Sequence, residues 1–441
     1  MNLTPSIFYN QFEDKVYVHN VDNQNDYIFS EIVLDILDYC KKNKNCSVQD
    51  ICKHLAGIYE VADIEDFQSD IQEFVDELLN EKILYEGETP YIEPQWSNKI
   101  PMEVAATFAK EHKIFSVSIE LTYRCVEKCI HCYIDDAPKF CAADELTLDE
   151  YKNILNQLKE LGCVNILFTG GEILLRPDLC DIVEYAVNLG FIVNLYTTGV
   201  GLTDKVFERL CAAKVNGISV SLYSGIAEEH DKITGVKGSF EKTLKATLMF
   251  KSAGINTFIK CVAMKQNLNS LKSLYELGKR LKLFVTVSPR IISGHEGKNS
   301  ADYSLGSVEL YQKFYKLNSQ YVTADTTAPK FSREKMLEKA SCGAGINAVS
   351  IDPFGGVHAC NTFPESFGSL RKESLKTIWD RAKNLKLKNC RMIDVTPQCK
   401  DCEYLEYCTV CVADLINKNH GDFSECGESL IMAKAAAEML R

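Results

Sequence analysis

The sequence lacks any long apolar run. No stretch approaches the roughly 18 uninterrupted apolar residues that a membrane-spanning helix needs. The first residues, MNLTPSIFYNQFEDK, also lack the basic flank and apolar core of a secretory signal. Hydrophobic residues make up 46% of the 441 positions and charged residues 25%, which is typical of globular proteins. We therefore expect a cytoplasmic protein of two or three domains with no membrane partner.

The first 95 residues are poor in basic side chains. They contain six lysines and no arginine against 20 aspartates and glutamates, a local charge of -14. The whole chain carries -12, so the remainder is close to +2. A duplex-binding surface needs several lysines and arginines to displace counterions from phosphates. We therefore expect no nucleic-acid partner.

The N-terminal pattern predicts a small winged-helix domain over residues 1–90. Short alternating strands are expected in KVYVHNV and DYIFS, around a turn at 22–26. Three helices follow. The first is expected to be capped by Ser30 and the second by Ser47 with Asp50, and the third is expected from Asp66 to Lys82. The segment KILYE then returns as a strand. A solvated acidic cap without a ligand is the alternative interpretation.

Beyond a linker at 91–110, strand and helix patterns alternate. The expected strands are IFSVSIE, VNILF, FIVNLY, GISVSLY, TFIKCVA and LFVTVS. The helix over 148–161 is expected to be capped by Thr147 with Glu150 and ended by Gly162. Six βα units predict an α/β fold with a partial (β/α)6 TIM-like barrel over 111–300. A bridging region at 301–341 and cysteine-rich loops at 342–441 complete the chain.

The 19 cysteines are the main chemical signal. A reducing compartment disfavours disulfides and favours metal ligation. Cys125, Cys129 and Cys132 follow the first barrel strand, where a barrel places its active site. A [4Fe-4S] cubane takes four ligands, so a loop with three thiolates leaves one iron open. A zinc site with a distant fourth ligand is the alternative.

This spacing resembles the radical S-adenosylmethionine (radical SAM) enzymes, whose signature is Cys-x3-Cys-x2-Cys. The resemblance implies a [4Fe-4S] cluster on the three cysteines, with SAM chelating the open iron through its amino and carboxylate groups. It also implies cleavage of SAM to a 5'-deoxyadenosyl radical.

Motifs on later strands support the resemblance: TGGE after the second strand, YTTG after the third and SVSLY after the fourth. Glu172 is expected to meet the SAM ammonium group and His131 to lie beside the adenine. The resemblance assigns cofactor contacts to His131, Tyr133, Gly170, Gly171, Glu172, Thr198 and Ser221. Alone, Gly-Gly-Glu is usually a turn, and a serine at a strand end is usually a cap. No general base can be assigned from the sequence.

The C-terminal third holds a second set of cysteines. They are Cys342, Cys360, Cys399, Cys402, Cys408, Cys411 and Cys426. Seven cysteines in a tract with few apolar runs predict folding around metals. Zinc is compatible with the Cys-x2-Cys-x5-Cys-x2-Cys portion and stays open as an alternative.

The whole arrangement resembles the SPASM extension of radical SAM enzymes, which binds two auxiliary [4Fe-4S] clusters. The resemblance assigns Cys342, Cys360 and Cys411 to the first cluster. It assigns Cys399, Cys402, Cys408 and Cys426 to the second. The spacing between Cys408 and Cys411 is two residues, where the family usually has three. The first cluster is then completed by Cys390 or another group, or keeps an open iron for a substrate thiolate.

Four further cysteines fall on core-facing helix or strand positions. Cys163, Cys180, Cys211 and Cys261 are expected to be small buried hydrophobic residues.

The SPASM resemblance implies a peptide or protein substrate. The N-terminal domain is similar in pattern to the RiPP recognition element, which binds the leader of a ribosomally made precursor peptide as an added strand. We therefore expect a radical SAM peptide maturase with a precursor peptide as partner and a reductant such as flavodoxin or ferredoxin.

Thioether cross-linking is the leading hypothesis for its chemistry. Carbon-carbon cross-linking and then epimerisation are the alternatives, and sulfatase maturation is disfavoured because it needs no leader-binding domain. A non-enzymatic iron-sulfur or zinc protein that binds peptides or transfers electrons is the alternative from a different class.

Overall fold

The structure is a computed structural model of the 441-residue chain. It describes residues 1–4, 7–12, 14–20, 25–61, 63–87, 108–134, 144–292, 300–322, 332–338, 342–382, 397–419 and 426–440. The chain divides into two compact units. The N-terminal unit comprises residues 1–110 with 190–192, and the barrel unit comprises residues 111–189 and 193–441. Most of the predicted turn at 22–26 and of the predicted linker at 91–110 lies outside the described residues.

The N-terminal unit consists of short strands and three helices. Its elements are β1 (Asn2–Leu3), β2 (Ile7–Phe12), β3 (Lys15–Asn20), β4 (Asn25–Ser30), α1 (Ile32–Lys42), α2 (Val48–Leu55), α3 (Ile64–Asn80) and β5 (Leu84–Tyr85). Strand β3 pairs antiparallel with β2 and β4, and β1 pairs with β5. Val16 and Val18 of β3 and the apolar faces of the helices are fully buried in one core. The predicted series of strands, three helices and a closing strand is therefore present, with β1 and β2 as additional strands.

Side-chain capping marks the start of two of the three described helices in this unit. Ser47 accepts a hydrogen bond from the Asp50 amide, and the Asp50 carboxylate accepts one from the Ser47 amide, as predicted. The prediction that Ser30 caps the first helix was wrong. Ser30 is the last residue of β4, and α1 begins after Glu31, whose side chain makes no capping bond. Helix α3 begins earlier than predicted because Asp63 accepts bonds from the next amides.

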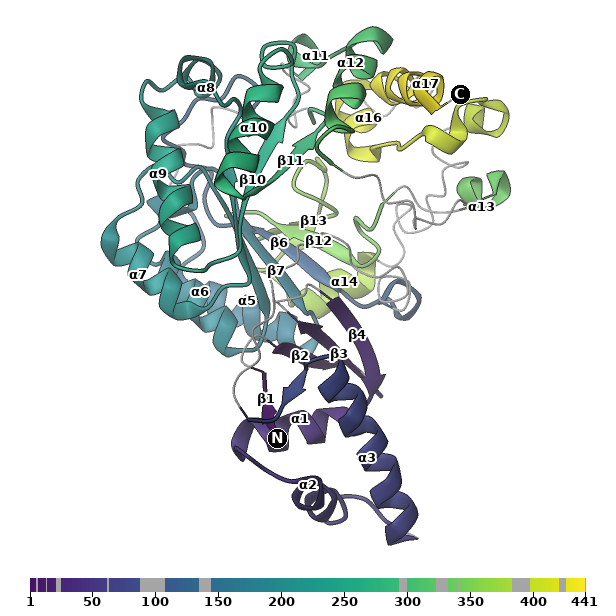
Figure 1. The fold of residues 1–441 in the computed structure, drawn as a ribbon. Helices are drawn as coiled ribbons and strands as arrows, with labels where there is room; N and C mark the ends of the chain where they lie inside the picture. The colour runs from purple at the N-terminus through teal and green to yellow at the C-terminus, as the bar shows by residue number, and fades with distance from the viewer. Residues whose placement is uncertain are drawn as a thin grey trace. The chain divides into compact units, whose positions relative to one another are not determined.

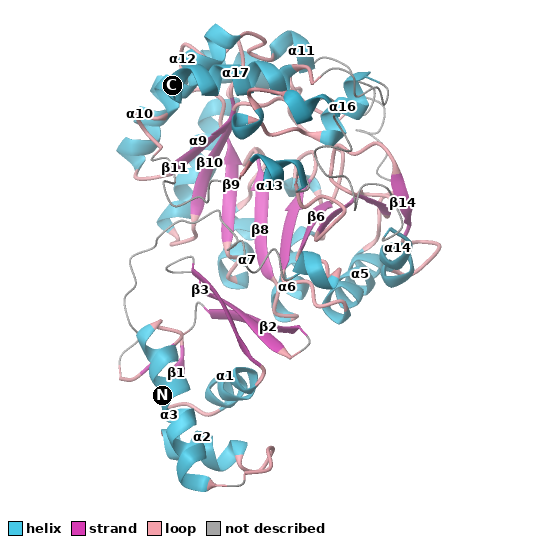
Figure 2. Cartoon of the chain, turned by 90° about the vertical axis from the view of Figure 1, so that its right-hand side faces the viewer, coloured by secondary structure: helices cyan, strands magenta, loops and turns pink. Residues whose placement is uncertain are grey.

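The barrel unit contains the six predicted parallel strands. They are β6 (Ser116–Glu120), β7 (Asn165–Thr169), β8 (Ile192–Thr197), β9 (Gly217–Ser221), β10 (Thr257–Val262) and β11 (Phe284–Ser288). They belong to a nine-stranded sheet with the order β11-β10-β9-β8-β7-β6-β12-β13-β14. Figure 2 shows β8 to β11 side by side. The α/β fold with a partial TIM-like barrel is therefore confirmed.

Helices alternate with these strands. They are η2 (Ile173–Leu175), α5 (Leu148–Glu160), α6 (Leu179–Asn188), α7 (Asp204–Ala213), α8 (Ala227–Thr234), α9 (Ser239–Ser252), α10 (Leu271–Leu281), α11 (Ser300–Tyr303) and α12 (Val308–Asn318). Helices α5, α6 and α7 pack in succession along the outside of the strands (Figure 1). Thr147 and Glu150 form the predicted capping box of α5, and Gly162 follows its end with φ +75°.

The C-terminal part is more regular than the predicted loops. It contains α13 (Arg333–Glu338), β12 (Ala348–Ile351), β13 (Gly356–His358), β14 (Ser366–Ser369), α14 (Leu375–Ala382), η4 (Pro397–Asp401), η5 (Leu405–Tyr407), α16 (Val412–Asn419) and α17 (Glu428–Leu440). Strand β12 pairs in parallel with β6, with Ala348 opposite Ser116. Helix α17 packs against α12 (Figure 1). In the described part of the chain, no helix has the length and apolarity to cross a membrane.

Candidate active site

The three predicted cluster cysteines line one cavity at the C-terminal ends of the barrel strands. Cys125, Cys129 and Cys132 lie in the loop after β6, and residues at the ends of β7 to β11 form other parts of the wall. The cavity has a volume of about 480 Å³. Loops that follow parallel strands meet at this end of a barrel, which explains how one short loop reaches the common centre.

Burial and mutual proximity set the protonation of these thiols. Loss of solvent, together with the neighbouring Glu172, Glu127 and Cys132, raises the pKa of Cys125 to about 12 against the lowering effect of a hydrogen bond from the Glu127 amide. Burial also raises the pKa of Cys129 well above its usual value, with Glu127, Cys132 and Cys125 adding to the effect. Thiolate is the form that ligates iron, so binding of iron must release protons from this loop.

The glycines of the TGGE motif lie against the start of the cysteine loop. The Gly171 amide donates to the Thr122 carbonyl oxygen at 2.7 Å, and the Glu172 amide donates to the Arg124 carbonyl oxygen at 2.8 Å. A Cβ atom on Gly170 or Gly171 would collide with these carbonyl oxygens. Gly170 also has φ +133°, which side-chain-bearing residues rarely adopt. Glycine is therefore required where the two backbones touch, at the cavity wall.

Glu172 supports the cavity wall through hydrogen bonds to residues at the end of β8. Its side chain is fully buried and accepts hydrogen bonds from Thr197 Oγ1 at 2.6 Å, the Thr198 amide at 2.7 Å, Thr198 Oγ1 and the Leu174 amide at 2.9 Å. Thr198 lines the cavity, whereas Glu172 is not among the lining residues of the described part. The expected contact of Glu172 with the SAM ammonium stays a prediction. The observed contacts assign it to fixing the end of β8.

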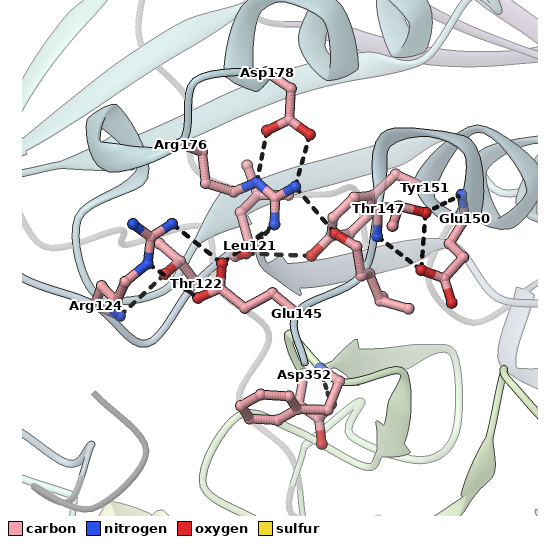
Figure 3. Close-up of polar contacts among 12 residues, drawn as sticks. Leu121, Thr122, Arg124, Glu145, Thr147, Glu150, Tyr151, Arg176, Asp178 and Asp352 are labelled. Carbon is pink, nitrogen blue, oxygen red and sulfur yellow. Dashed lines mark hydrogen bonds and ion pairs between the residues drawn. The ribbon is translucent and has the colours of Figure 1, made fainter. Parts of the chain in front are cut away.

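A buried ionic network anchors the segment that joins β6 to the cysteine loop (Figure 3). Arg176 Nη2 lies 2.7 Å from Asp178 Oδ2, and its Nη1 lies 3.5 Å from Glu145 Oε2. Glu145 also pairs with Arg124 Nη2 at 3.2 Å and accepts a hydrogen bond from Thr122 Oγ1 at 2.5 Å. Because every carboxylate in this network has a partner, burial of these charges is compensated and the loop start is fixed.

The remaining predicted cofactor contacts also face the cavity. His131, Tyr133 and Ser221 all line it. The His131 ring packs edge-on against Tyr223 with centroids 4.5 Å apart, and burial lowers the pKa of His131 to about 4. The imidazole of His131 is therefore neutral near pH 7. Its expected position beside the adenine of SAM stays a prediction. Tyr133 donates a hydrogen bond to Glu120 Oε1 at 2.6 Å.

Four of the C-terminal cysteines lie near one another, and two more form a separate pair; their assignment to clusters stays a prediction. Burial, together with the nearby Cys399, Cys426 and Cys402, raises the pKa of Cys408 to about 12. These four cysteines are the set assigned to the second auxiliary cluster. Cys411 lies near Cys360, which contributes to its raised pKa after the dominant effect of burial. Cys360 also lines the cavity that holds Cys125, Cys129 and Cys132, so the two cysteine fields meet there.

Other cysteines lie apart from these groups. Cys342 is exposed. Cys390 lies outside the described residues. Cys163, Cys180 and Cys261 are buried hydrophobic residues, as predicted. Cys211, which lies on the outer helix α7, is only partly buried, so the expectation that it is buried was wrong.

Sequence reasoning missed two charged residues at the cavity. Glu120 is the last residue of β6 and is 1% exposed, directly behind Tyr133. Arg290 follows β11 and lines the cavity, where it donates to the Thr409 carbonyl oxygen at 2.7 Å and to Ser429 Oγ at 3.1 Å. Each is a charged residue at the C-terminal end of a buried barrel strand, and that position was the available signal.

The donor set suits iron-sulfur clusters. Thiolates are the ligands that such clusters take, and the three loop cysteines share one cavity that leaves room for a further ligand. Among the residues that the structure describes, no group of three or more His, Cys, Asp or Glu side chains is arranged to hold a single metal ion. A cubane makes a different demand, because each thiolate bonds to its own iron atom.

Three family models match the chain. The radical SAM superfamily model matches residues 119–278, and the iron-sulfur cluster-binding domain model, SPASM, matches residues 342–403. The model of coenzyme PQQ synthesis protein D, PqqD, matches residues 21–84. These matches fall within the ranges predicted for the three domains, whose boundaries stay predictions.

Individual proteins are similar over most of the chain. The AdoMet-dependent heme synthase of Methanosarcina barkeri is 29% identical over 319 residues, which cover 67% of this chain and 90% of that protein. The antilisterial bacteriocin subtilosin biosynthesis protein AlbA of Bacillus subtilis is 24% identical over 415 residues, 89% of each chain. The crystal structure of Streptococcus suis SuiB bound to precursor peptide SuiA has a TM-score of 0.63 at 16% identity, covering 98% of this chain and 99% of that chain. At this identity the last likeness shows the fold alone.

Proposed function

We propose that this chain, a radical SAM enzyme with an iron-sulfur cluster-binding SPASM domain and a PqqD domain, forms thioether cross-links in a ribosomally made precursor peptide. One observation carries the proposal. Cys360, assigned to an auxiliary cluster, lines the same cavity as the three cysteines of the radical SAM loop. A peptide segment in that cavity would lie within reach of both centres.

The protein would bind its cofactors with the residues that form this cavity. Cys125, Cys129 and Cys132 would hold a [4Fe-4S] cluster, which together with SAM supplies a 5'-deoxyadenosyl radical. The backbone of Gly170 and Gly171 would border SAM, and His131, Tyr133, Thr198 and Ser221 would contact it. Apolar side chains such as Leu167, Val262 and Ile291 line the same space and keep water from a reactive carbon radical.

The thioether assignment rests on the auxiliary cysteines. Cys342, Cys360 and Cys411 would hold the first auxiliary cluster, and Cys399, Cys402, Cys408 and Cys426 the second. A set of three protein ligands leaves a position for the thiolate of a substrate cysteine, which is the soft ligand that iron-sulfur clusters prefer. Forming a carbon-sulfur bond at that place removes two hydrogens from the peptide.

The N-terminal unit would bind the leader of the precursor. Its sheet has the order β2-β3-β4, so β2 and β4 are outer strands that an extended peptide could join. Residues 1–95 carry a charge of -14, which would favour a leader with lysines or arginines. We place the protein in the cytoplasm with a reductant such as flavodoxin or ferredoxin. The domains would extend over 1–90, 111–300 and 342–441.

A tetrapyrrole substrate is the second candidate. It is favoured by the 29% identity to a heme synthase. That alignment covers 67% of this chain, whereas the alignment with the subtilosin biosynthesis protein covers 89%. A heme-forming activity would also leave the PqqD match at residues 21–84 without a purpose.

The decisive experiment is anaerobic co-expression with the short cysteine-containing peptide encoded nearest to the gene, followed by intact and fragment mass spectrometry. A loss of two hydrogens per modified site, with the cysteine no longer alkylated, is the expected result. The same loss with an alkylated cysteine would indicate a carbon-carbon bond. An unchanged mass with deuterium incorporated from solvent would indicate epimerisation, and an unmodified peptide beside a bound porphyrin would favour the second candidate.

A further inference from the structure

The loop that carries the radical SAM cysteines has an outer surface as well as a cavity surface. Cys125, Cys129 and Cys132 line the cavity. Between the first two of them, Val126 is 38% exposed, and the Lys128 side chain is also exposed. Solvent therefore reaches the chain one residue away from two of the predicted cluster ligands.

The end of helix α8 supports this outer surface. The Lys128 amide donates a hydrogen bond to the Thr234 carbonyl oxygen at 2.8 Å. The Ile130 amide donates one to the Ile233 carbonyl oxygen at 3.0 Å. A Cβ atom on Gly235 would lie 3.5 Å from the Lys128 Cβ. Helix α9 follows at once and packs beside α8 (Figure 1), so the cysteine loop and the corner between the two helices form one continuous surface.

This surface is basic. Its exposed lysines are Lys128 in the cysteine loop, Lys232 in α8, Lys237 between the helices, and Lys242 and Lys245 in α9. Within the part of the chain that the structure describes, none of these five lysines takes part in an ion pair. The whole chain carries a charge of -12, so the charge of this corner is opposite in sign to that of the chain.

The acidic groups near these lysines are mostly hydrogen-bonded, buried or remote. The Asp231 carboxylate accepts hydrogen bonds from two amides at the start of α9, at 2.5 Å and 2.9 Å. Glu127 of the cysteine loop is 3% exposed. Glu228 and Glu229 lie in the first turn of α8, at the opposite end of that helix. The exposed Glu241 in the first turn of α9 is the remaining acidic residue, so the lysines dominate the corner.

Apolar side chains lie beside the lysines of α9. Leu244, Leu248 and Met249 line a groove of about 520 Å³ together with Lys245. Leu248 is 40% exposed. Lys242 and Lys245 are three residues apart and therefore share one side of the helix. Exposed apolar residues rimmed by charged ones are typical of a surface that binds another protein.

The chemistry of the radical SAM site indicates what kind of protein this surface binds. Reductive cleavage of SAM consumes one electron, which a donor outside the chain must deliver to the cluster. Because the rate of electron transfer falls steeply with distance, the donor must dock where the cysteine loop reaches the surface. A basic surface attracts an acidic partner and speeds its association. Electron-transfer complexes are small and transient, which suits a corner of this size.

We propose that the corner between α8 and α9, together with Lys128, is the docking site of an acidic flavoprotein of the flavodoxin type. Its reduced flavin loses one electron, and the cluster held by the three cysteines gains that electron. Carboxylates around the flavin would face the lysines, and the apolar edge of the flavin ring would face Val126. The proposal rests on the radical SAM match over residues 119–278 and is independent of the thioether chemistry.

The test compares two reductants on the iron-loaded, full-length enzyme. Lys237→Glu and Lys242→Glu are made singly, because both residues lie outside the cysteine loop. One reductant is a flavodoxin kept reduced by its NADPH-dependent reductase and supplied at limiting concentration. The other is dithionite, a small molecule that needs no docking surface. With flavodoxin at low ionic strength, each variant should form 5'-deoxyadenosine about fivefold more slowly than the wild type. With dithionite, all rates should be equal.

Binding supplies a second readout that does not depend on activity. The dissociation constant for oxidised flavodoxin, measured by anaerobic titration calorimetry, should rise about fivefold in each variant. Added salt should weaken binding to the wild type and reduce this difference, because it screens exposed charges. The matched control is Lys372→Glu, an equal change of charge at an exposed residue after β14, at the far end of the nine-stranded sheet. The control should change neither the rate nor the dissociation constant.

Three results would overturn the proposal. The first is a fully iron-loaded variant that equals the wild type with flavodoxin. The second is a variant that loses the same activity with dithionite, because the lysine would then act on the site and not on docking. The third is a wild type that accepts electrons from dithionite or an acidic ferredoxin but from no flavodoxin. If a glutamate variant loses iron, Lys237→Gln and Lys242→Gln carry the test. An enzyme that cleaves SAM but leaves the peptide unmodified would contradict the proposed function alone.

Discussion

The barrel and the cysteine-rich C-terminal part are stabilised in different ways. One cluster of 21 buried residues comes mainly from the barrel side and also takes in Met432 and Ala435 of α17; its members Ile259, Leu271 and Leu274 are fully buried. The described cluster around Leu405 has six buried members, and one of them is the predicted ligand Cys399. Buried apolar area is the main source of folding free energy, so the barrel can fold without metal. We expect the region around Leu405 to depend on bonds between its thiolates and iron, because its core is small.

The largest expected effect separates the chemistry of the two cysteine fields. Cys125→Ala should reduce reductive SAM cleavage to background, because two thiolates cannot hold the cluster to which SAM binds. Cys360→Ala should still cleave SAM but form no modified peptide. The measurement is anaerobic assay of 5'-deoxyadenosine and of peptide mass in parallel. Modified peptide from either variant would contradict the assignment of these cysteines.

Removal of iron should destabilise the cysteine-rich region and leave the barrel folded. Chelation under reducing conditions should make residues 397–419 at least about tenfold more sensitive to limited proteolysis, because opening then requires no loss of metal bonds. The barrel over 116–288 should stay resistant. Mass spectrometry of the fragments locates the cuts. Equal sensitivity of both regions would mean that the barrel also depends on iron.

Substitutions in the two cores should differ in whether their effect on stability depends on iron. Ile259→Ala in β10 should lower the free energy of unfolding by about 2–5 kcal/mol with or without iron, since its neighbours are other barrel residues. Leu405→Ala should destabilise the iron-loaded protein to a similar degree and have little effect on the iron-free protein. Denaturant unfolding of both forms supplies the comparison. A Leu405 effect that is independent of iron would show that the small core folds unaided.

Buried barrel cysteines should behave as hydrophobic residues. Cys163 is fully buried, and loss of solvent raises the pKa of its thiol to about 12. Cys163→Ala should cost about 1 kcal/mol through lost packing and leave the iron content unchanged. Unfolding and iron analysis of the same sample test both statements. A loss of iron would give Cys163 a role in cluster assembly.

The smallest effect is expected where the two regions meet. Arg371, which follows β14, lies 2.9 Å from Glu150 of α5 and lowers the pKa of Glu150 to about 2, helped by the capping bonds to Thr147. A lowered folded-state pKa stabilises the protein above the ordinary value of about 4.5, and the gain is lost as the pH falls toward 2. Both side chains are about one-third exposed, so Glu150→Gln should cost less than about 1 kcal/mol at pH 7.

The difference between Glu150→Gln and the wild type should therefore shrink in acid. Thermal unfolding between pH 7 and pH 3 measures this trend. Arg381→Gln is a useful control, since Arg381 pairs with Glu373 within the C-terminal part alone. A difference that grows in acid would show that the Arg371 pair is not its cause.

Local sequence signals predicted the barrel better than the cavity contacts. The strands alternate regularly and Thr147 with Glu150 marks a helix start, so the six βα units could be placed from short windows. The Cys-x3-Cys-x2-Cys spacing also lies within one short window, so the loop of Cys125, Cys129 and Cys132 could be identified from the local sequence. Strands β12 to β14 have only three or four residues each, too few for a period to show.

Long-range contacts escaped prediction. Glu120 meets Tyr133 from its own loop but meets Asn361 only because β12 returns beside β6. The hydrogen bonds of the Glu172 carboxylate to the end of β8 could not be read from the sequence, and its expected contact with SAM stays a prediction. Ser30 failed as a cap because β4 continues through it. In each case tertiary pairing decided the role of a residue whose local sequence permitted several.

The pairing of β12 with β6 has a consequence for recombining related enzymes. A crossover at residue 342 would take β12 from one parent and β6 from the other, although Ala348 to Ile351 and Ser116 to Ile119 form a single parallel ladder. In a hybrid joined there, β12 of one parent must pair in the correct hydrogen-bond register with β6 of the other. A mismatch would leave β6 as an unpaired sheet edge that is prone to self-association. A junction after β14, beyond Ser369, keeps the ladder within one parent and exchanges only the later cysteines.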